Sequence, residues 1–566
     1  MSNRLNSRKN KGLIILDIKT KIIDGLKSAI EKAMDAGELT VGEVPEIQLE
    51  VPPEKSLGDF SSNIAMQSAK VFRKSPKMIA EIIVKNLEGD WLERAEVAGP
   101  GFLNLYLKGN VLADSFLNIY EKGDDFGQCP PKNAGKIQVE YVSANPTGPL
   151  HVGHGRGAAF GSALVNLLRA AGYDVKSEYY INDAGNQMDI LALSVDIRYR
   201  ELFGEEIEHP EQMYRGEDII DTAKRIKAID GDKYLKLSEA ERLEIFKNLA
   251  YKEKLAILKE DLEEFQVTFD EWFSERTLHP EAIDTAIETL KEKGKAYDKE
   301  GAIWLNSTSY GDDKDRVIIR DNGVPTYLAA DIAYHKNKFE RGFGKLINIW
   351  GADHHGYVCR VKAAMDALGF NAKNLEILLM QMVSLYRGGE LVKMSKRTGE
   401  SITLKELMEE VGVDAARYFF LMRSADSQLD FDLDLAKKES SENPVYYVQY
   451  AHARICSIMK NAPEAGLKLL DKPDFSLLKE DVEVELMKKI SSFEEEIDKA
   501  AEIYAPQRIA KYAYDLASAF HSFYNHCRIV GVDENLGNAR LALAYETARV
   551  IRLALSILGV SAPEKM

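Results

Sequence analysis

Apolar residues recur at helical spacing near the start of the chain. Residues 18–35 carry isoleucine, leucine and methionine at the 3.6-residue repeat of an amphipathic helix, and 62–72 and 76–87 repeat the pattern. Apolar and polar positions alternate at 95–97 and 102–107, as in strands that face a core on one side. These patterns predict a compact α+β unit at the N-terminal end.

The pattern changes to strand, turn-rich loop, helix and strand from Lys136 onward. Residues 137–143 and 174–183 predict strands, and 158–172 have the apolar spacing of a helix. Such a βαβ unit predicts a parallel sheet with right-handed crossovers. Residues 185–300 predict mostly charged amphipathic helices, which we interpret as an insertion.

Strand patterns resume before the chain becomes almost entirely helical from about residue 404. The predicted fold class is α/β, with a Rossmann-like parallel-sheet domain between an N-terminal α+β domain and a C-terminal all-helical bundle. The later strand patterns are 302–305, 316–320, 346–351 and 377–386. The expected domains are 1–115, 116–435 and 436–566.

Composition narrows the class of protein. The chain has 566 residues, of which 45% are hydrophobic, as in globular proteins of more than one domain. No stretch approaches the ~20 apolar residues of a membrane helix, and the apolar run Leu13–Leu16 is too short for a secretory signal. The four cysteines lie far apart. We therefore expect a cytoplasmic protein with reduced thiols, no membrane association and no structural metal.

The net charge of −16 argues mildly against a nucleic-acid partner, because phosphate contacts favour lysine and arginine. It does not exclude one. A folded RNA can be recognised by its shape and by stacking against a local basic face of an acidic protein.

A glycine- and histidine-rich loop lies between the first strand and the helix of the βαβ unit. Its residues His151, Gly153 and His154 stand where a helix N-terminus binds anions through N–H groups and the helix dipole. Two imidazoles three positions apart share a helix face and can donate to phosphate oxygens. Alone, the pattern is also compatible with a glycine-rich turn that carries incidental histidines.

A basic loop follows the last predicted strand, in the segment LVKMSKRTGE (391–400). Lys393 and Lys396 flank Ser395, and two ammonium groups with a hydroxyl suit the β- and γ-phosphates of a nucleotide. A lone KxxK is common in solvated loops. The joint occurrence of HVGH and KMSK, about 240 residues apart, is far more specific.

At these two motifs the chain resembles the class I aminoacyl-tRNA synthetases, whose hallmark sequences are HIGH and KMSKS. Here they read HVGH at 151–154 and KMSKR at 393–397, and neither departure removes a proposed catalytic group. The resemblance implies ATP as a substrate, accompanied by Mg²⁺. The catalytic residues that it implies are His151, His154, Lys393 and Lys396, and Gly153, Asp353 and Ser395 would also bind ATP.

The stretch VEYVSANPTGPLHVGHGRG (139–157) is similar to the first motif of arginyl-tRNA synthetases. A guanidinium prefers planar, bidentate carboxylate partners. By this resemblance, the guanidinium would be held by Glu140, Tyr327 and Asp331, and the α-amino and carboxylate end by Ser143 and Asn145, with His154 and His355 nearby.

Each of these residues has another possible role when it is considered alone. Glu140 ends a strand and could be an ordinary surface residue. Tyrosines such as Tyr327 more often lie in a core, and Asp331 could pair with Arg320 or Arg341. Only the combined set supports an arginine site.

The resemblance covers nearly the whole chain. It implies that the N-terminal domain binds the elbow of a tRNA through GPGFLNLYL (99–107), and that the C-terminal bundle binds the anticodon, beginning with NPVYYVQYAHARICSI (443–458). Aromatic and arginine side chains can stack on splayed bases, although core packing is open for each aromatic. The tRNA-binding candidates are Phe102, Asn104, Tyr447, Tyr450, Arg454, Tyr524 and Met566.

The activity implied is ligation of L-arginine to tRNA(Arg). Arginine and ATP would form arginyl-adenylate and pyrophosphate, and the arginyl group would pass to the 3′-terminal adenosine. By resemblance, tRNA must be bound before activation proceeds. We expect a monomer.

Three other functions are weighed against this one. A class I synthetase for cysteine would need zinc-ligand cysteines, and one for glutamate would need cations where Glu140 and Asp331 stand. A non-catalytic tRNA-binding paralogue would have no need of HVGH, KMSK and the carboxylates together. A smaller nucleotidyltransferase would not need the C-terminal bundle.

Overall fold

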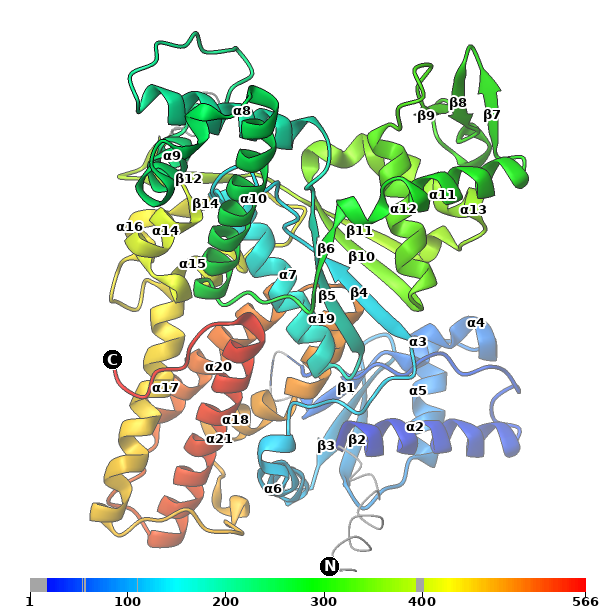
Figure 1. The fold of residues 1–566 in the computed structure, drawn as a ribbon. Helices are drawn as coiled ribbons and strands as arrows, with labels where there is room; N and C mark the ends of the chain where they lie inside the picture. Colours follow the sequence, from blue (N-terminus) through cyan, green and yellow to red (C-terminus); the bar gives the residue numbers. More distant parts are fainter. Residues whose placement is uncertain (1–17, 53, 55–56, 109, 393–401) are drawn as a thin grey trace, which may run out of the picture. The chain divides into compact units, whose positions relative to one another are not determined.

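The computed structural model describes residues 18–52, 54, 57–108, 110–392 and 402–566 (Figure 1). The chain forms two compact units. Unit 1 comprises residues up to Phe126 together with Ser457–Ser492 and Ala519–Thr547. Unit 2 comprises Gly127–Cys456, Phe493–Ser518 and Ala548–Met566.

Unit 1 contains the predicted α+β structure. Its antiparallel sheet has the order β1-β3-β2, and Leu103 and Leu105 of the middle strand are fully buried against the helices. The strands are β1 (Phe60–Ser62), β2 (Leu92–Ala98) and β3 (Phe102–Leu107). The helices are α2 (Ile18–Asp35), α3 (Ile64–Gln67), α4 (Ala69–Phe72), α5 (Pro76–Asn86), α6 (Val111–Lys122) and α18 (Asp481–Ser491).

Unit 2 is built on a five-stranded parallel sheet of order β11-β10-β4-β5-β6, so the predicted α/β fold class is confirmed. Helix α7 (Val152–Ala170) contacts one face, and α12 (Tyr327–Glu340) and α13 (Val358–Leu368) cover the other (Figure 1). The strand order reverses beside β4, and such a switch point is where ligands bind in open α/β sheets. The strands are β4 (Lys136–Glu140), β5 (Asp174–Ile181), β6 (Glu271–Ser274), β10 (Phe343–Gly351) and β11 (Leu375–Met380).

The segment expected to be an insertion is mostly helical, but part of it belongs to the central sheet. Residues 271–274 form the edge strand β6, which pairs with β5. Farther along, β7 (Ala296–Lys299), β8 (Ala302–Leu305) and β9 (Arg316–Ile319) form a separate antiparallel sheet. The helices of this segment are α8 (Asn186–Glu201), α9 (Glu217–Asp230), α10 (Glu239–Glu264) and α11 (Glu281–Glu292).

The single strand expected over 377–386 is interrupted. It divides into β11 and β12 (Val383–Arg387), and β12 pairs with β13 (Glu390–Val392) and β14 (Leu429–Asp432). At the interruption, the guanidinium of Arg156 donates to the carbonyls of Gln381 and Met382, the two residues between β11 and β12.

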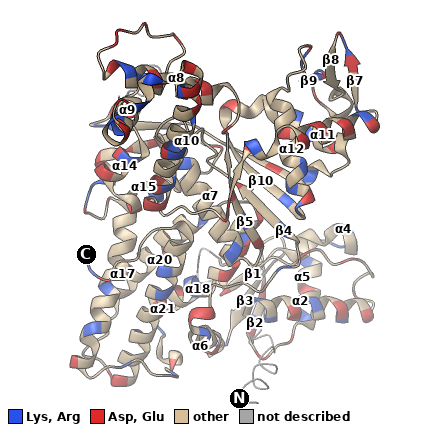
Figure 2. Cartoon of the chain, in the orientation of Figure 1, with Lys and Arg blue, Asp and Glu red and all other residues tan. Residues whose placement is uncertain are grey.

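The remainder of the chain is helical, as expected. Figure 2 shows basic and acidic residues interspersed along helices such as α9 and α10. None of the described helices combines the length and apolar composition that crossing a bilayer requires. The later helices are α14 (Leu404–Val411), α15 (Val413–Phe420), α16 (Leu433–Ala436), α17 (Pro444–Asn461), α19 (Phe493–Glu502), α20 (Gln507–His526) and α21 (Glu534–Leu558).

Candidate active site

The two histidines of HVGH form the N-terminal cap of α7. His151 Nδ1 accepts a hydrogen bond from the N–H of Gly153 at 3.1 Å, and His154 Nδ1 accepts one from the N–H of His151 at 3.3 Å. The two rings stack with their centroids 3.7 Å apart. Because Nδ1 is the acceptor in both rings, the nitrogen that carries the proton of each neutral imidazole is Nε2.

The segment after the KMSK motif docks onto the HVGH loop. Lys393, Ser395 and Lys396 lie outside the described residues, but His151 forms an isolated β-bridge with Thr403 just beyond them. Gly155 makes this approach possible. A Cβ atom at that position would lie 2.7 Å from Leu404 Cδ1.

A buried arginine holds the same helix from its inner side. The guanidinium of Arg156 donates to the carbonyls of Gln381 (2.9 Å), Ser424 (2.8 Å) and Ser427 (2.9 Å), besides Met382. Burial lowers the pKa of Arg156 to about 10. The side chain therefore fixes α7 relative to two loops near the ends of β11 and β14.

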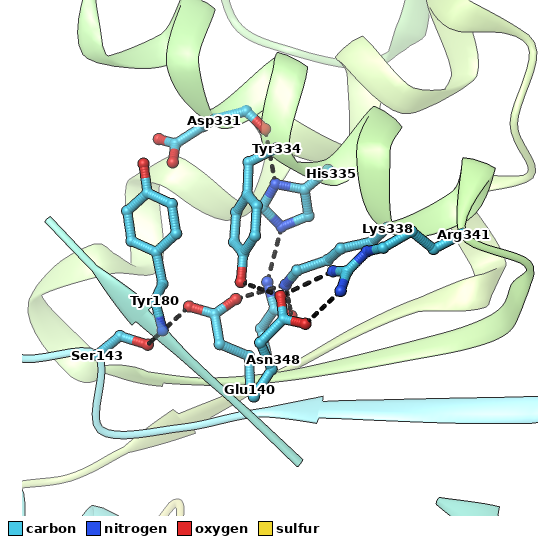
Figure 3. A network of polar contacts seen from close by, with 10 residues as sticks. Glu140, Ser143, Tyr180, Asp331, Tyr334, His335, Lys338, Arg341 and Asn348 are labelled. Atoms are coloured by element: carbon cyan, nitrogen blue, oxygen red, sulfur yellow. Dashed lines mark hydrogen bonds and ion pairs between the residues drawn. The ribbon is translucent and has the colours of Figure 1, made fainter. Parts of the chain in front are cut away.

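A row of polar residues crosses the sheet on the face covered by α12. Asn348 of β10, Glu140 of β4 and Glu178 of β5 lie in register on neighbouring parallel strands, so their side chains point to the same face (Figure 3). All three are buried. Above them α12 and the residue after it present a polar stripe at helical spacing, made of Asp331, Tyr334, His335, Lys338 and Arg341.

Two of the carboxylates in this layer are paired with cations. Lys338, which is fully buried, donates to Glu140 Oε2, and Arg341 forks onto Glu178 with bonds of 2.7 and 2.8 Å. Burial alone would raise the pKa of Glu178, but the bonds from Arg341 and the nearby Lys338 give a net lowering. Glu140 and Glu178 are thus neutralised from within the protein.

Two further carboxylates lack such a partner. Among the described residues, neither Asp331 nor Glu275 forms an ion pair with a lysine or arginine, and Glu275 is 7% exposed, with its carboxylate 3.3 Å from the ring nitrogen of His279. Burial, with the charges of Glu140 and Glu275, raises the pKa of Asp331 to about 7, despite a 2.7 Å bond from the Tyr357 hydroxyl. Burial likewise raises the pKa of Glu275.

The phenol of Tyr180 marks the space that these carboxylates share. Burial, and then the charges of Glu275, Asp331 and Glu140, raise the pKa of Tyr180 far above its usual value. In Figure 3 its ring extends from β5 toward Asp331. The result is an anionic cluster at the carboxyl edge of the sheet, suited to a delocalised cation.

The loop after β4 is strained. Val142 and Ser143 have φ angles of 68° and 43°, a region that a β-branched residue rarely occupies, and such strain costs about 1–3 kcal/mol per residue. Ser143 Oγ donates to Glu140 Oε1 at 3.0 Å and accepts from the N–H of Tyr180 at 3.1 Å. Asn145, farther along the same loop, is half-buried.

Other predicted ligands lie around the same edge. Tyr327, the first residue of α12, is 68% exposed. Asp353 and His355 are exposed in the 3₁₀ turn Ala352–Tyr357 that follows β10. This turn also supplies Tyr357, so one short segment contacts the carboxylate of Asp331 and presents two exposed polar groups.

The residues predicted to contact tRNA are spread over several elements of the chain. In β3, Phe102 is half-buried and Asn104 is 5% exposed. Of the candidates in the C-terminal helices, Tyr447 packs on Tyr514 with ring centroids 5.0 Å apart. Tyr450 is 37% exposed, and its hydroxyl accepts a hydrogen bond from Arg454 at 2.7 Å. Tyr524 is 39% exposed and Met566 is 51% exposed.

The fold and the site define the class of protein. A five-stranded parallel sheet, a histidine-capped helix after its first strand and an acidic cluster at the switch point are found within residues 118–432, which match the family model "tRNA synthetases class I (R), catalytic domain". Residues 20–107 match "Arginyl tRNA synthetase N terminal domain", and 448–566 match "DALR anticodon binding domain". The chain belongs to the arginyl-tRNA synthetase family.

Relatives match it over nearly their whole length. An arginine–tRNA ligase of Bacillus subtilis (strain 168) is 50% identical over 556 residues, 97% of this chain and 100% of its own. One from Heliobacterium modesticaldum is 49% identical over 557 residues, 97% and 99% of the two chains. The expected family, enzyme class and activity are thereby confirmed.

Solved structures share the fold of this chain. A Campylobacter jejuni chain described as an arginyl tRNA synthetase is 43% identical, with a TM-score of 0.76 over 81% of this chain and 100% of that one. Thermus thermophilus arginyl-tRNA synthetase shares the fold at 23% identity, with a TM-score of 0.74 over 96% of this chain and 100% of that one.

The structure adds residues that the sequence patterns did not single out. Glu275 lies in the segment that the sequence analysis interpreted as a helical insertion. The sequence feature that could have indicated it is the strand-like EWFS directly before it. Tyr357 directly follows the predicted His355 segment. Lys338 lies seven positions after Asp331, on the same helix face.

Proposed function

We propose that this chain activates L-arginine with ATP and transfers the arginyl group to the 3′-terminal adenosine of tRNA(Arg). The observation that carries the proposal is a pair of carboxylates, the buried Glu275 and the partly buried Asp331, that have no lysine or arginine partner among the described residues. They lie at the switch-point edge of the sheet, from which the histidine-capped helix also starts.

Charge balance supports guanidinium binding at this pair. Lys338 and Arg341 already neutralise Glu140 and Glu178, whereas burial raises the pKa values of Glu275 and Asp331, and the charges of Glu140 and Glu275 add to the rise at Asp331. A planar cation with five donors relieves both and can bond each carboxylate. The exposed ring of Tyr327, one turn before Asp331, is expected to complete this end of the site.

We assign the other substrate contacts from the sequence motifs and their positions. Ser143 and Asn145 would bind the α-amino and carboxylate end of arginine, with His154 and His355 nearby. ATP would contact the N-terminus of α7, and Asp353 would face its ribose. The proposed ATP ligands are His151, Gly153, His154, Asp353, Lys393, Ser395 and Lys396.

In the proposed reaction the carboxylate of arginine attacks the α-phosphorus of ATP in line, and pyrophosphate leaves. The Nε2–H donors of His151 and His154 and the ammonium groups of Lys393 and Lys396 stabilise the charge that develops on the phosphates. Catalysis is therefore positioning and electrostatics, with no covalent intermediate on the protein. The 2′- or 3′-hydroxyl of the terminal adenosine then attacks the arginyl-adenylate.

Mg²⁺ would enter with ATP, bound by phosphate oxygens and water. Mg²⁺ usually keeps several waters and binds substrate phosphates rather than an all-protein cage. Its chemistry is neutralisation of phosphate charge. A cytoplasmic location and a monomeric state are part of the proposal.

For tRNA, we propose elbow contacts through Phe102 and Asn104 and anticodon contacts through the bundle. Stacking on exposed aromatic rings contributes roughly 1–3 kcal/mol per base. The proposed anticodon contacts are Tyr447, Tyr450, Arg454, Tyr524 and Met566.

The test is ATP–pyrophosphate exchange with each of the twenty amino acids, with and without total tRNA. Exchange with arginine alone, and only when tRNA is present, is the expected result and includes the tRNA requirement. Exchange with another amino acid would retain the class I assignment and reject the acidic cluster as an arginine site. No exchange with any amino acid while tRNA still binds would favour a non-catalytic paralogue.

A further inference from the structure

The ammonium of Lys338 lies at the centre of the polar layer between α12 and the sheet. It donates to Glu140 Oε2 and to Asn348 Oδ1, the latter at 3.1 Å, and its side chain is fully buried. Asn348 Nδ2 donates in turn to His335 Nε2 at 2.7 Å, and His335 Nδ1 donates to the carbonyl of Asp331 at 2.8 Å. A continuous chain of hydrogen bonds therefore joins the backbone of Asp331 to Glu140 (Figure 3).

The carboxylate of Glu140 is occupied on both oxygens. Oε2 accepts from Lys338, and Oε1 accepts from Ser143 Oγ at 3.0 Å. Glu140 is also 6% exposed. Because this carboxylate is already bonded to a permanent cation and to a hydroxyl donor, a second cation would gain little free energy by binding to it.

The Ser143 hydroxyl is the link to the strained turn. Ser143 and the preceding Val142 have left-handed φ angles, and strain of this kind persists only where the surroundings fix it. Two contacts fix it here, namely the bond to Glu140 and the bond from the N–H of Tyr180. The same turn carries Asn145 toward the loop that leads to His151.

We propose that Lys338 and Glu140 act together as a positioning pair, in which the lysine is the permanent counter-ion of the glutamate and the glutamate holds the Ser143 turn in the conformation that receives the α-amino end of arginine. The carboxylates that hold the guanidinium are then Glu275 and Asp331. The proposal rests on the proposed function, because it assigns the division of labour within the same arginine site.

The test compares three variants: Glu140→Gln, Lys338→Met, and the double variant. Glu140→Gln still presents an oxygen to Ser143 but leaves the ammonium of Lys338 without its carboxylate, whereas Lys338→Met leaves the carboxylate of Glu140 buried without its cation. The double variant removes both charges and keeps the acceptor for Ser143. KM for arginine, KM for ATP, kcat of exchange and Tm are measured for each, after the wild-type protein has been shown to exchange with arginine.

The expected result is a rise of about tenfold or more in KM for arginine in each single variant, and recovery to within about threefold of the wild type in the double variant. KM for ATP stays unchanged throughout. A purely structural pair would lower Tm and the active fraction without moving KM for arginine, and that outcome would overturn the proposal. A double variant as impaired as Glu140→Gln would also overturn it, because Glu140 would then contact arginine directly.

Lys336→Met is the matched control. Lys336 is on the same helix, two residues earlier, and pairs with Glu340 at the surface. Its loss is expected to leave both KM values within about twofold. An equal effect on KM for arginine would show that any cation on α12 matters and would reject the specific pair.

Asn348→Ser is a milder variant that tests the proposal even if the single variants of Glu140 and Lys338 do not fold. This change keeps the buried ion pair and removes one of the two bonds that orient its ammonium. A rise of about threefold or more in KM for arginine, at constant KM for ATP, is expected. No change would overturn the proposal. Failure of the wild-type protein to exchange with arginine would instead reject the proposed function.

Discussion

Leu404 donates its backbone N–H to the carbonyl oxygen of Leu150 at 2.7 Å, which joins the segment after the KMSK motif to the residue before His151. The HVGH loop and the segment that begins at Ile402 are thus connected by main-chain contacts, although more than two hundred residues separate them in the sequence. These contacts depend on how closely α7 and the start of α14 can approach.

Gly155→Val is expected to disturb this approach. A Cβ there lies 2.7 Å from Leu404 Cδ1 and 3.3 Å from the ring of Phe420, and overpacking of this kind costs about 1–3 kcal/mol. We expect kcat of exchange to fall about tenfold or more and KM for ATP to rise, with KM for arginine less affected. Steady-state exchange kinetics measure all three.

Gly157→Ala is the control for that change. A Cβ at Gly157, on the same helix, meets no atom within 4 Å. The change is expected to keep activity and to stabilise the helix by roughly 0.5–1 kcal/mol, seen as a higher Tm. Wild-type kinetics in Gly155→Val would contradict the role given to the close contact.

Arginine binding is expected to release a proton from Asp331. Its pKa of about 7 in the free protein lies above the unfolded value, so the stability due to its protonation is present at acid pH and is lost as the pH rises through about 7. A guanidinium requires the ionised form. KM for arginine should therefore rise about tenfold between pH 8 and pH 6.

Calorimetry in buffers of different ionisation enthalpy measures the released proton directly. Asp331→Asn is the control, with a high KM for arginine that no longer follows this titration. Persistence of the same pH dependence in Asp331→Asn would assign the proton to Glu275, whose pKa burial also raises.

Glu275→Gln is expected to raise KM for arginine by about 10–100-fold, because a charge-assisted bond to a guanidinium contributes roughly 1.5–3 kcal/mol. KM for ATP should change little. Glu271→Gln, at an exposed position of strand β6 directly before Glu275, is the matched control and should behave as the wild type. Equal KM values for the two variants would remove Glu275 from the site.

Lys396→Ala is expected to lower the rate of exchange far more than it weakens arginine binding, since an ammonium on the departing phosphates acts mainly in the transition state. Single-turnover measurement of adenylate formation, together with arginine titration, separates the two effects. Equal losses in rate and affinity would count against a phosphate role for Lys396.

The motifs could be predicted from sequence because short-range geometry determines them. HVGH after a strand places two imidazoles on one helix end, and the structure places His151 and His154 there, stacked and capping α7. The helical and strand periods also predicted most elements, including α2 over Ile18–Asp35.

The polar layer could not be predicted in the same way. A polar stripe on a helix normally faces water, and the spacing of Tyr334, His335 and Lys338 gives no sign that here it faces the sheet. Their burial depends on Glu140 and Asn348, which come from strands far away in the sequence. Glu275 was missed for a related reason, because a four-residue edge strand within a helical segment gives little periodic signal.

The guanidinium of Arg156 has a consequence for how the catalytic unit opens. It donates hydrogen bonds to the carbonyls of Gln381 and Met382 on one loop and of Ser424 and Ser427 on another. Neither loop can therefore detach without leaving some hydrogen-bond donors of a buried charge unsatisfied. Amide hydrogens around both loops and the first turns of α7 should therefore exchange with solvent at one common rate, as a single cooperative opening unit.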